Sequence, residues 1–235
     1  MGASPLRRRL HSIAGFFNKL LDRFLRFPAK PGPQKTLDID STMRNSTLRI
    51  MNNNSLLGFA LLGLTFEQPM SGYDLRKVFT TTAMGSFSDS PGAIYPALAR
   101  LEANGLIRGT VEESASLRKR RVFDITPTGL AALKAWLMKP VMRDDIVRGI
   151  GDLMLRFAFM DRTVGAERTI GFLQEFAGEI EAYLPSLGEF LEAHAGKMPL
   201  SARLALECGV QEYEMRLRWV RASAAQYKER KGNKS

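Results

Sequence analysis

Two short stretches of the sequence combine residue types that can bind a phosphate-rich partner. The first, SPGAIYP at 90–96, begins like a helix, with Ser90 as the N-cap and Pro91 at the first helical position. A helix N-terminus has free N–H groups and a positive dipole end, which suit a phosphate oxygen. Tyr95 can donate to a phosphate or stack on a sugar or a thymine methyl group. The stretch therefore favours contact with DNA.

The second stretch, SASLRKRR at 114–121, places four cations in a row at the expected turn and returning strand of a β-hairpin. These cations are Arg118, Lys119, Arg120 and Arg121. Such a cluster neutralises phosphates, releases counterions and supplies affinity that does not depend on base sequence. Glu112 and Glu113 stand on the opposite strand, so the alternative is a solvated hairpin with cross-strand ion pairs.

A purely structural interpretation of the first stretch also stands. In it, Gly92 and Pro96 only form a tight turn, and Tyr95 half-buries against Tyr73. In the DNA-binding interpretation, small residues let the helix backbone approach the duplex, and a cation farther along the helix contacts the DNA backbone. The helical residues assigned to DNA binding are Tyr73, Ser90, Pro91, Gly92, Ala93, Tyr95 and Arg100.

The elements that must position both stretches form a compact unit over residues 55–139. SLLGFALLGL, which opens this unit, is apolar on nearly every side and predicts a buried helix. A second helix is expected to begin at Ser71, because Asp74 follows three residues later as in a capping box. The third helix, which carries SPGAIYP, is expected to end at the pair Asn104-Gly105.

Two strands and a fourth helix complete the unit. LIRGTVEE and KRRVFDI predict the strands, with Phe123 and Ile125 on the face opposite Val122 and Asp124. Thr126 then begins the helix PTGLAALKAWL. Three helices, a hairpin and a linking helix make the plan of a winged helix-turn-helix, in which the third helix lies in the major groove of DNA. We predict a mainly α protein with this winged helix-turn-helix followed by a C-terminal α-helical dimerisation domain.

The remaining segments flank this unit. Residues 1–27 alternate leucine and phenylalanine with basic residues at helical spacing, and residues 28–54 are rich in Pro, Asn, Ser and Thr and are expected to be a linker. Because basic amphipathic helices can lie in lipid headgroups, a membrane-surface adaptor or a tethered regulator is the alternative function. Translation from Met43 or Met51 is a further alternative, which would make the first segment an upstream extension. Liposome flotation of residues 1–40 would separate these interpretations.

Residues 141–230 predict long amphipathic helices, and the last of them carries a seam spaced alternately four and three. The seam consists of Leu206, Val210, Tyr213, Leu217, Val220, Ala224 and Tyr227. This a/d pattern suits a coiled-coil partner. Because these helices carry the only long apolar surfaces outside the compact unit, we predict that the last helix crosses a homodimer interface. The alternative is that the helices of 141–230 pack into an ordinary intrachain bundle.

Composition restricts the other classes of function. Of the +10 net charge of the 235 residues, seven come from residues 1–50, so the rest of the chain is only mildly basic. The single cysteine, Cys208, excludes an intrachain disulfide and fits a reducing compartment. Isolated histidines leave no zinc-binding pattern, and neither a Gly-rich phosphate loop nor a serine with a partnering histidine occurs. We therefore expect no enzyme, no metal and no cofactor.

In order along the chain, LLGFALLGL, MSGYDLRKVF, SPGAIYPALARLEANGLI and KRRVFDITPTGLAALKAWL resemble the DNA-binding domain of the PadR family of bacterial transcriptional regulators. The resemblance runs from about Leu56 to Leu137. The family's wing usually ends in paired tyrosines before Leu-Thr-Pro-x-Gly. Here Val122 and Phe123 stand in their place, which removes one hydroxyl that could touch DNA.

RDDIVRGIGDLMLRFAFMD also resembles the start of the C-terminal effector and dimerisation region of the longer family members. The family resemblance implies a homodimeric regulator, usually a repressor, that binds an inverted repeat of double-stranded DNA. It also implies a small-molecule effector, and in this family effectors range from phenolic acids to toxic compounds. We expect such a protein to be cytoplasmic and associated with the nucleoid.

Overall fold

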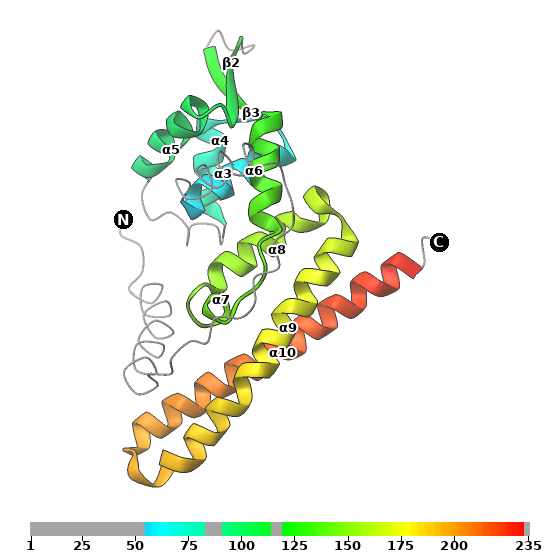
Figure 1. Cartoon of the computed structure of the whole chain (residues 1–235). Helices are drawn as coiled ribbons and strands as arrows, with labels where there is room; N and C mark the ends of the chain where they lie inside the picture. Colours follow the sequence, from blue (N-terminus) through cyan, green and yellow to red (C-terminus); the bar gives the residue numbers. More distant parts are fainter. Residues whose placement is uncertain (1–54, 83–90, 114–118, 233–235) are drawn as a thin grey trace, which may run out of the picture. The chain divides into compact units, whose positions relative to one another are not determined.

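The structure is a computed structural model that describes residues 55–82, 91–113 and 119–232 (Figure 1). The described residues form two compact units that divide between Lys139 and Pro140. The expected N-terminal helix at 1–27, the expected linker at 28–54, and the predicted DNA contacts Ser90 and Arg118 lie outside the described residues.

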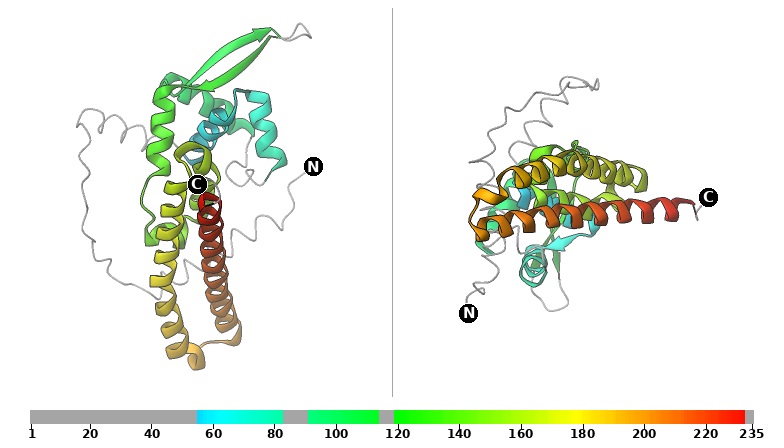
Figure 2. Two further views of the ribbon diagram at one scale, coloured as in Figure 1. Left: turned by 90° about the vertical axis from the view of Figure 1, so that its right-hand side faces the viewer. Right: turned by 90° about the horizontal axis from the view of Figure 1, so that it is seen from below.

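The first unit is a winged helix-turn-helix, as the sequence predicts. Its elements are α3 (Leu56–Glu67), β1 (Met70–Ser71), α4 (Gly72–Thr81), α5 (Pro91–Ala103), β2 (Ile107–Glu113), β3 (Lys119–Ile125) and α6 (Pro127–Leu137). The three strands form one antiparallel sheet in the order β1-β3-β2. The long pair β2–β3 is the wing, which projects beyond the helices of its unit (Figure 2).

The two-residue strand β1 was not expected from the sequence, and it changes the environment of the wing. Met70 pairs with Phe123, and Ser71 pairs with Val122, so that β3 becomes the central strand of the sheet. Val122 and Phe123 point to opposite faces, yet both are buried. The expected alternation of a buried and an exposed face is therefore wrong at this point. Both faces of β3 carry contacts to helices here, because Arg120 reaches α4 and Arg121 reaches α5.

Side-chain caps fix where the helices begin. The Ser71 hydroxyl accepts a hydrogen bond from the Asp74 N–H at 3.2 Å, which confirms the predicted start of α4. The Thr126 hydroxyl accepts from the Gly129 N–H at 3.0 Å and donates to the Gly105 carbonyl at 2.7 Å. This second cap therefore also holds the turn at the end of α5, where Gly105 has a φ of 68°.

A glycine is required at position 129, because the backbone of α6 lies very close to the Leu106 carbonyl there. A Cβ atom at this position would lie 1.9 Å from the carbonyl oxygen of Leu106, which is far inside the contact distance of the two atoms. The backbone of α6 can therefore lie directly against the α5–β2 turn. Deeper in the unit, Phe59 of α3 stacks on Trp136 of α6 with ring centroids 4.6 Å apart. Helix α3 is buried on nearly every side, as its sequence predicts.

The second unit contains only helices among its described residues. They are α7 (Arg143–Arg148), α8 (Ile150–Val164), α9 (Ala166–His194), a short 3-10 turn (Ala195–Lys197) and α10 (Leu200–Gly232). Helices α9 and α10 run side by side along most of their length (Figure 2). Gly165, with a φ of 83°, makes the corner between α8 and α9.

The structure fills the predicted seam of α10 from within the same chain. Tyr213 contacts the ring of Tyr183 on α9 edge to face at 5.3 Å, and its hydroxyl donates to the Ile146 carbonyl at 3.4 Å. Tyr227 contacts Phe157 on α8 in the same edge-to-face manner. The seam residues buried in this way are Leu206, Tyr213, Val220 and Ala224, while Val210, Leu217 and Tyr227 stay partly exposed. This packing matches the intrachain alternative for the four buried residues.

No described helix is both long and apolar enough to cross a membrane. Within the described ranges, no group of three or more His, Cys, Asp or Glu side chains gathers in a way that could hold a metal ion.

The burial of Tyr213 makes the free energy of unfolding of the second unit fall as the pH becomes alkaline. Burial raises the pKa of Tyr213 above its ordinary value of 10.0. Above about pH 10 the unfolded chain loses this proton first, so the stability present at neutral pH falls as the pH rises. We expect Tyr213→Phe to weaken this loss, measured from chemical unfolding by circular dichroism at about pH 8 and about pH 10.5. Tyr73→Phe, which changes an exposed tyrosine, is the control. An unchanged pH dependence in Tyr213→Phe would contradict the expectation.

Candidate nucleic-acid interface

Helix α5 separates its residues into a buried stripe and a small, nearly uncharged outer face. The buried stripe consists of Ile94, Ala97, Leu98 and Leu101, each at most 2% exposed. The outer face consists of Gly92, Ala93, Tyr95, Pro96, Ala99 and Arg100, all exposed or partly exposed. Pro91 is the first residue of the helix, as the sequence predicts. A helix with this outer face can approach another backbone closely, because Tyr95 is the one large side chain among the small residues of its first two turns.

Tyr95 lies against the beginning of α4. A Cβ atom at Gly72 would be only 2.8 Å from Cε1 of Tyr95, so the ring occupies the space that the missing side chain leaves open. The Tyr95 side chain is still 51% exposed. One edge of the ring is therefore packed against α4, as the structural interpretation expects. The other edge is exposed to solvent, as contact with DNA requires.

Tyr73 extends the exposed surface onto α4. Its side chain is 63% exposed, and the Arg76 guanidinium lies 5.8 Å from its ring centroid, within the range of a cation–π contact. Arg76 and its neighbour Lys77 are exposed and were absent from the predicted site. Their position three and four residues after Tyr73 on a helix was the signal that could have found them.

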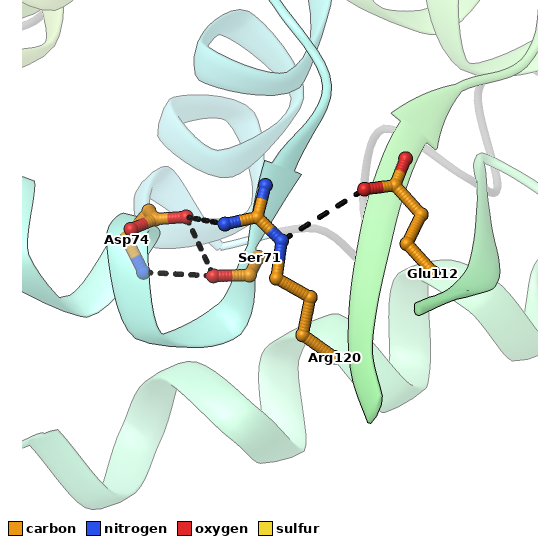
Figure 3. Close-up of polar contacts among 4 residues, drawn as sticks. All are labelled: Ser71, Asp74, Glu112 and Arg120. Atoms are coloured by element: carbon orange, nitrogen blue, oxygen red, sulfur yellow. Dashed lines mark hydrogen bonds and ion pairs between the residues drawn. The ribbon is translucent and has the colours of Figure 1, made fainter. Parts of the chain in front are cut away.

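The two arginines of β3, Arg120 and Arg121, point to opposite faces of the strand and have different partners. Nη1 of Arg120 lies 3.8 Å from Oδ2 of Asp74, and Nε lies 3.8 Å from Oε2 of Glu112 (Figure 3). The pair with Glu112 is the cross-strand ion pair of the alternative interpretation, since the two residues face each other in the register of the sheet. The Arg120 side chain nevertheless remains 53% exposed.

Arg121 is held more tightly. Its Nη2 donates to Oε1 of Glu102 at 2.7 Å, and the same oxygen accepts from the Gly109 N–H at 3.0 Å. A Cβ atom at Gly109 would lie 2.5 Å from Nε of Arg121 and 2.9 Å from this carboxylate oxygen. The glycine thus lets the ion pair lie flat on β2, and one carboxylate of α5 joins both strands of the wing to the helix.

The structure therefore brings most of the predicted residues it describes onto one connected set of elements. Tyr95 contacts the start of α4, Asp74 in the first turn of α4 reaches Arg120, and Glu102 of α5 reaches Arg121. Arg100 is exposed on α5, five residues after Tyr95. Lys119 begins β3 opposite Glu113 of β2. Asp74, Glu102 and Gly109 shape this surface and were not among the residues predicted to form it.

The shared carboxylate of Glu102 gives a stability prediction. Glu102→Ala leaves the partly buried Gly109 N–H without its acceptor and releases Arg121, so we expect a loss of about 1–2 kcal/mol. Glu102→Gln keeps an oxygen acceptor and should cost less than half as much. Urea unfolding of the full chain, followed by Trp136 fluorescence in a Trp219→Phe background, measures both variants. An unfolding midpoint of Glu102→Ala equal to that of the parent protein would contradict this role.

Comparison with known proteins places this unit in a family. Residues 61–135 match the family described as "Transcriptional regulator PadR-like family". The chain is also 27% identical over 84 residues to the negative transcriptional regulator PadR of Bacillus subtilis (strain 168), over 36% of this chain and 46% of that protein. The match thus spans less than half the length of this relative.

Solved structures of similar proteins were also found. The crystal structure of Bacillus subtilis PadR in complex with operator DNA is 21% identical, covers 73% of this chain and 98% of its own, and has a TM-score of 0.33. A PadR-like transcriptional regulator from Bacillus cereus is 27% identical over 42% of this chain and 91% of its own, with a TM-score of 0.32. The part of the chain that matches the PadR-like family of transcriptional regulators is thus residues 61–135, within the first unit.

Proposed function

We propose that this chain is a DNA-binding regulator of transcription that places α5 in the major groove of a duplex. The observation that carries the proposal is the outer face of α5, on which Tyr95 stands half-exposed among small residues at the start of the helix. In a helix-turn-helix, the N-terminal residues of the third helix read the base edges. Gly92 and Ala93 keep that end of the helix low enough for the backbone to come close to DNA.

The contacts divide into those that read bases and those that hold the backbone. We assign contact with the base edges to Tyr95, because its ring packs against Gly72 on one side and is exposed on the other. Tyr73 and Arg100 flank it and can reach phosphates, and Arg120 of the wing adds charge on an adjacent element. This division assigns sequence specificity to α5 and sequence-independent affinity to the wing and to Arg100.

We further propose that the protein acts as a homodimeric repressor on an inverted repeat, with half-sites about 10 base pairs apart. Each chain has one α5 among its described residues, so recognition of two half-sites needs two chains. Within the predicted seam, the partly exposed Val210, Leu217 and Tyr227 are the residues available to a second chain without unpacking the bundle. A small-molecule effector and a cytoplasmic location on DNA complete the proposal. The membrane alternative depends on residues 1–27, which are not among the described residues.

The proposal is tested by finding the DNA site and mapping its protection. Duplexes selected from a random library by the full-length protein give the cognate sequence, and hydroxyl-radical footprinting then shows which backbone positions are covered. We expect two symmetric protected half-sites whose centres lie about one helical turn apart. Protection of one asymmetric half-site would exclude the symmetric dimer, and a failure to enrich any duplex would exclude sequence-specific DNA binding.

Tyr95 provides a second test, because loss of a base contact and loss of a phosphate contact change binding to the selected site and to random DNA differently. Tyr95→Ala should weaken binding to the selected site about five- to tenfold, with a much smaller effect on random DNA. Arg100→Ala, the matched variant on the same helix, should weaken both duplexes equally and reduce the salt slope by about one unit. Tyr95→Phe separates the hydroxyl from the ring. Equal losses on both duplexes for Tyr95→Ala would reduce its role to packing or phosphate contact.

A further inference from the structure

Arg120 lies between two carboxylates without a close hydrogen bond to either. Its Nη1 and Nε are each 3.8 Å from a carboxylate oxygen, one of Asp74 and one of Glu112 (Figure 3). All three side chains are between 39% and 54% exposed. At such a distance the attraction is electrostatic and does not fix the direction of the guanidinium. The group is therefore held at its place by charge while its donors remain accessible to solvent.

The neighbouring Arg121 shows what a structural ion pair looks like in the same wing. Its guanidinium donates to Glu102 at 2.7 Å, and the carboxylate is also tied to the backbone of β2. Arg121 therefore already has a well-placed oxygen partner in the protein. Arg120 has two distant ones, so a third anion can replace them at little cost.

The position of Asp74 identifies the kind of anion. Asp74 lies in the first turn of α4, where its Oδ2 accepts from the Ser71 hydroxyl at 2.6 Å and also faces Arg120. In a helix-turn-helix bound to DNA, the helix before the recognition helix crosses the phosphate backbone. A carboxylate at this end of α4 thus occupies, in front of Arg120, the kind of position that a phosphate oxygen takes when DNA is bound.

We propose that Asp74 and Glu112 compete with DNA phosphate for Arg120 and so lower the affinity of the protein for duplexes of any sequence. The proposal rests on the DNA-binding function proposed above. In the free protein the two carboxylates attract the Arg120 guanidinium electrostatically from 3.8 Å. On binding, Arg120 turns to a phosphate, and both carboxylates are left facing the negative backbone. Part of the electrostatic gain of the wing is thereby cancelled, which keeps binding to non-cognate DNA weak and shallow in its salt dependence.

Two single variants and their combination test this competition. Asp74→Asn keeps an oxygen that can accept a hydrogen bond from the Ser71 hydroxyl. Because Glu112 does not cap a helix, Glu112→Gln remains informative if Asp74→Asn disturbs α4. The probe is a random-sequence duplex several helical turns long, titrated with full-length protein by fluorescence anisotropy over a series of salt concentrations. Glu214→Gln, an exposed glutamate of α10, makes the same change in net charge and is the matched control.

Each variant should tighten binding to the random duplex by up to about fivefold at low salt, the range expected for one exposed ion pair. The slope of the logarithm of the binding constant against the logarithm of the salt concentration should steepen by up to about one unit, the value for one additional phosphate contact. Glu214→Gln should bind like the wild-type protein. In an Arg120→Ala background, Asp74→Asn should have a clearly smaller effect, because the competition requires the arginine. Circular dichroism confirms that the variants are folded.

The outcomes separate this proposal from the function on which it rests. If the wild-type protein binds no duplex at low salt, DNA binding itself is excluded. If the wild-type protein binds but both carboxylate variants bind as weakly as the control, the competition is excluded and the function stands. If Asp74→Asn tightens binding equally with and without Arg120, the carboxylate only repels the backbone through space, and the proposed exchange of partners is overturned.

Discussion

The hydroxyl of Thr126 joins the turn that follows α5 to the first turn of α6, and the two ends of the wing meet at this contact. It accepts from Gly129 and donates to Gly105, while the bare Cα of Gly129 lets the Leu106 carbonyl come within reach. The wing starts directly after this turn and ends directly before this cap. The contact therefore ties the two ends of the wing to the end of α5 and the start of α6.

A second constraint acts on charge. The wing of a DNA-binding unit needs cations, but four adjacent cations repel one another and weaken a two-stranded ribbon. This chain places an acidic residue next to each described arginine of the strand: Glu102 for one face, and Asp74 with Glu112 for the other. The carboxylates come from α5, α4 and β2, so neutralising the wing also ties it to the two helices that face the duplex in our proposal. Charge balance and shape are supplied by the same side chains.

Much of this architecture could be predicted from local patterns. The periodicity of apolar residues, the caps at Ser71 and Thr126 and the Asn104-Gly105 stop are all short-range signals, and the helices that they predict within the described residues are present. The strand β1 was missed because two residues are too few to show a period. The pair between Glu102 and Arg121 joins residues 19 positions apart on a helix and a strand, and no spacing rule connects them. The burial of both faces of β3 was missed for the same reason, since it depends on which helices pack there.

The seam of α10 shows a different limit of sequence patterns, and it has a consequence for the life of the protein in the cell. A heptad pattern predicts that a helix has a partner but does not say which chain supplies it. Here the chain supplies it, so the apolar surface of Tyr213 and Val220 is covered as soon as one copy has folded. An obligate dimer, by contrast, has no stable folded subunit and loses its structure on dilution. In the homodimer that we propose, the two subunits can therefore separate and exchange without exposing these buried side chains.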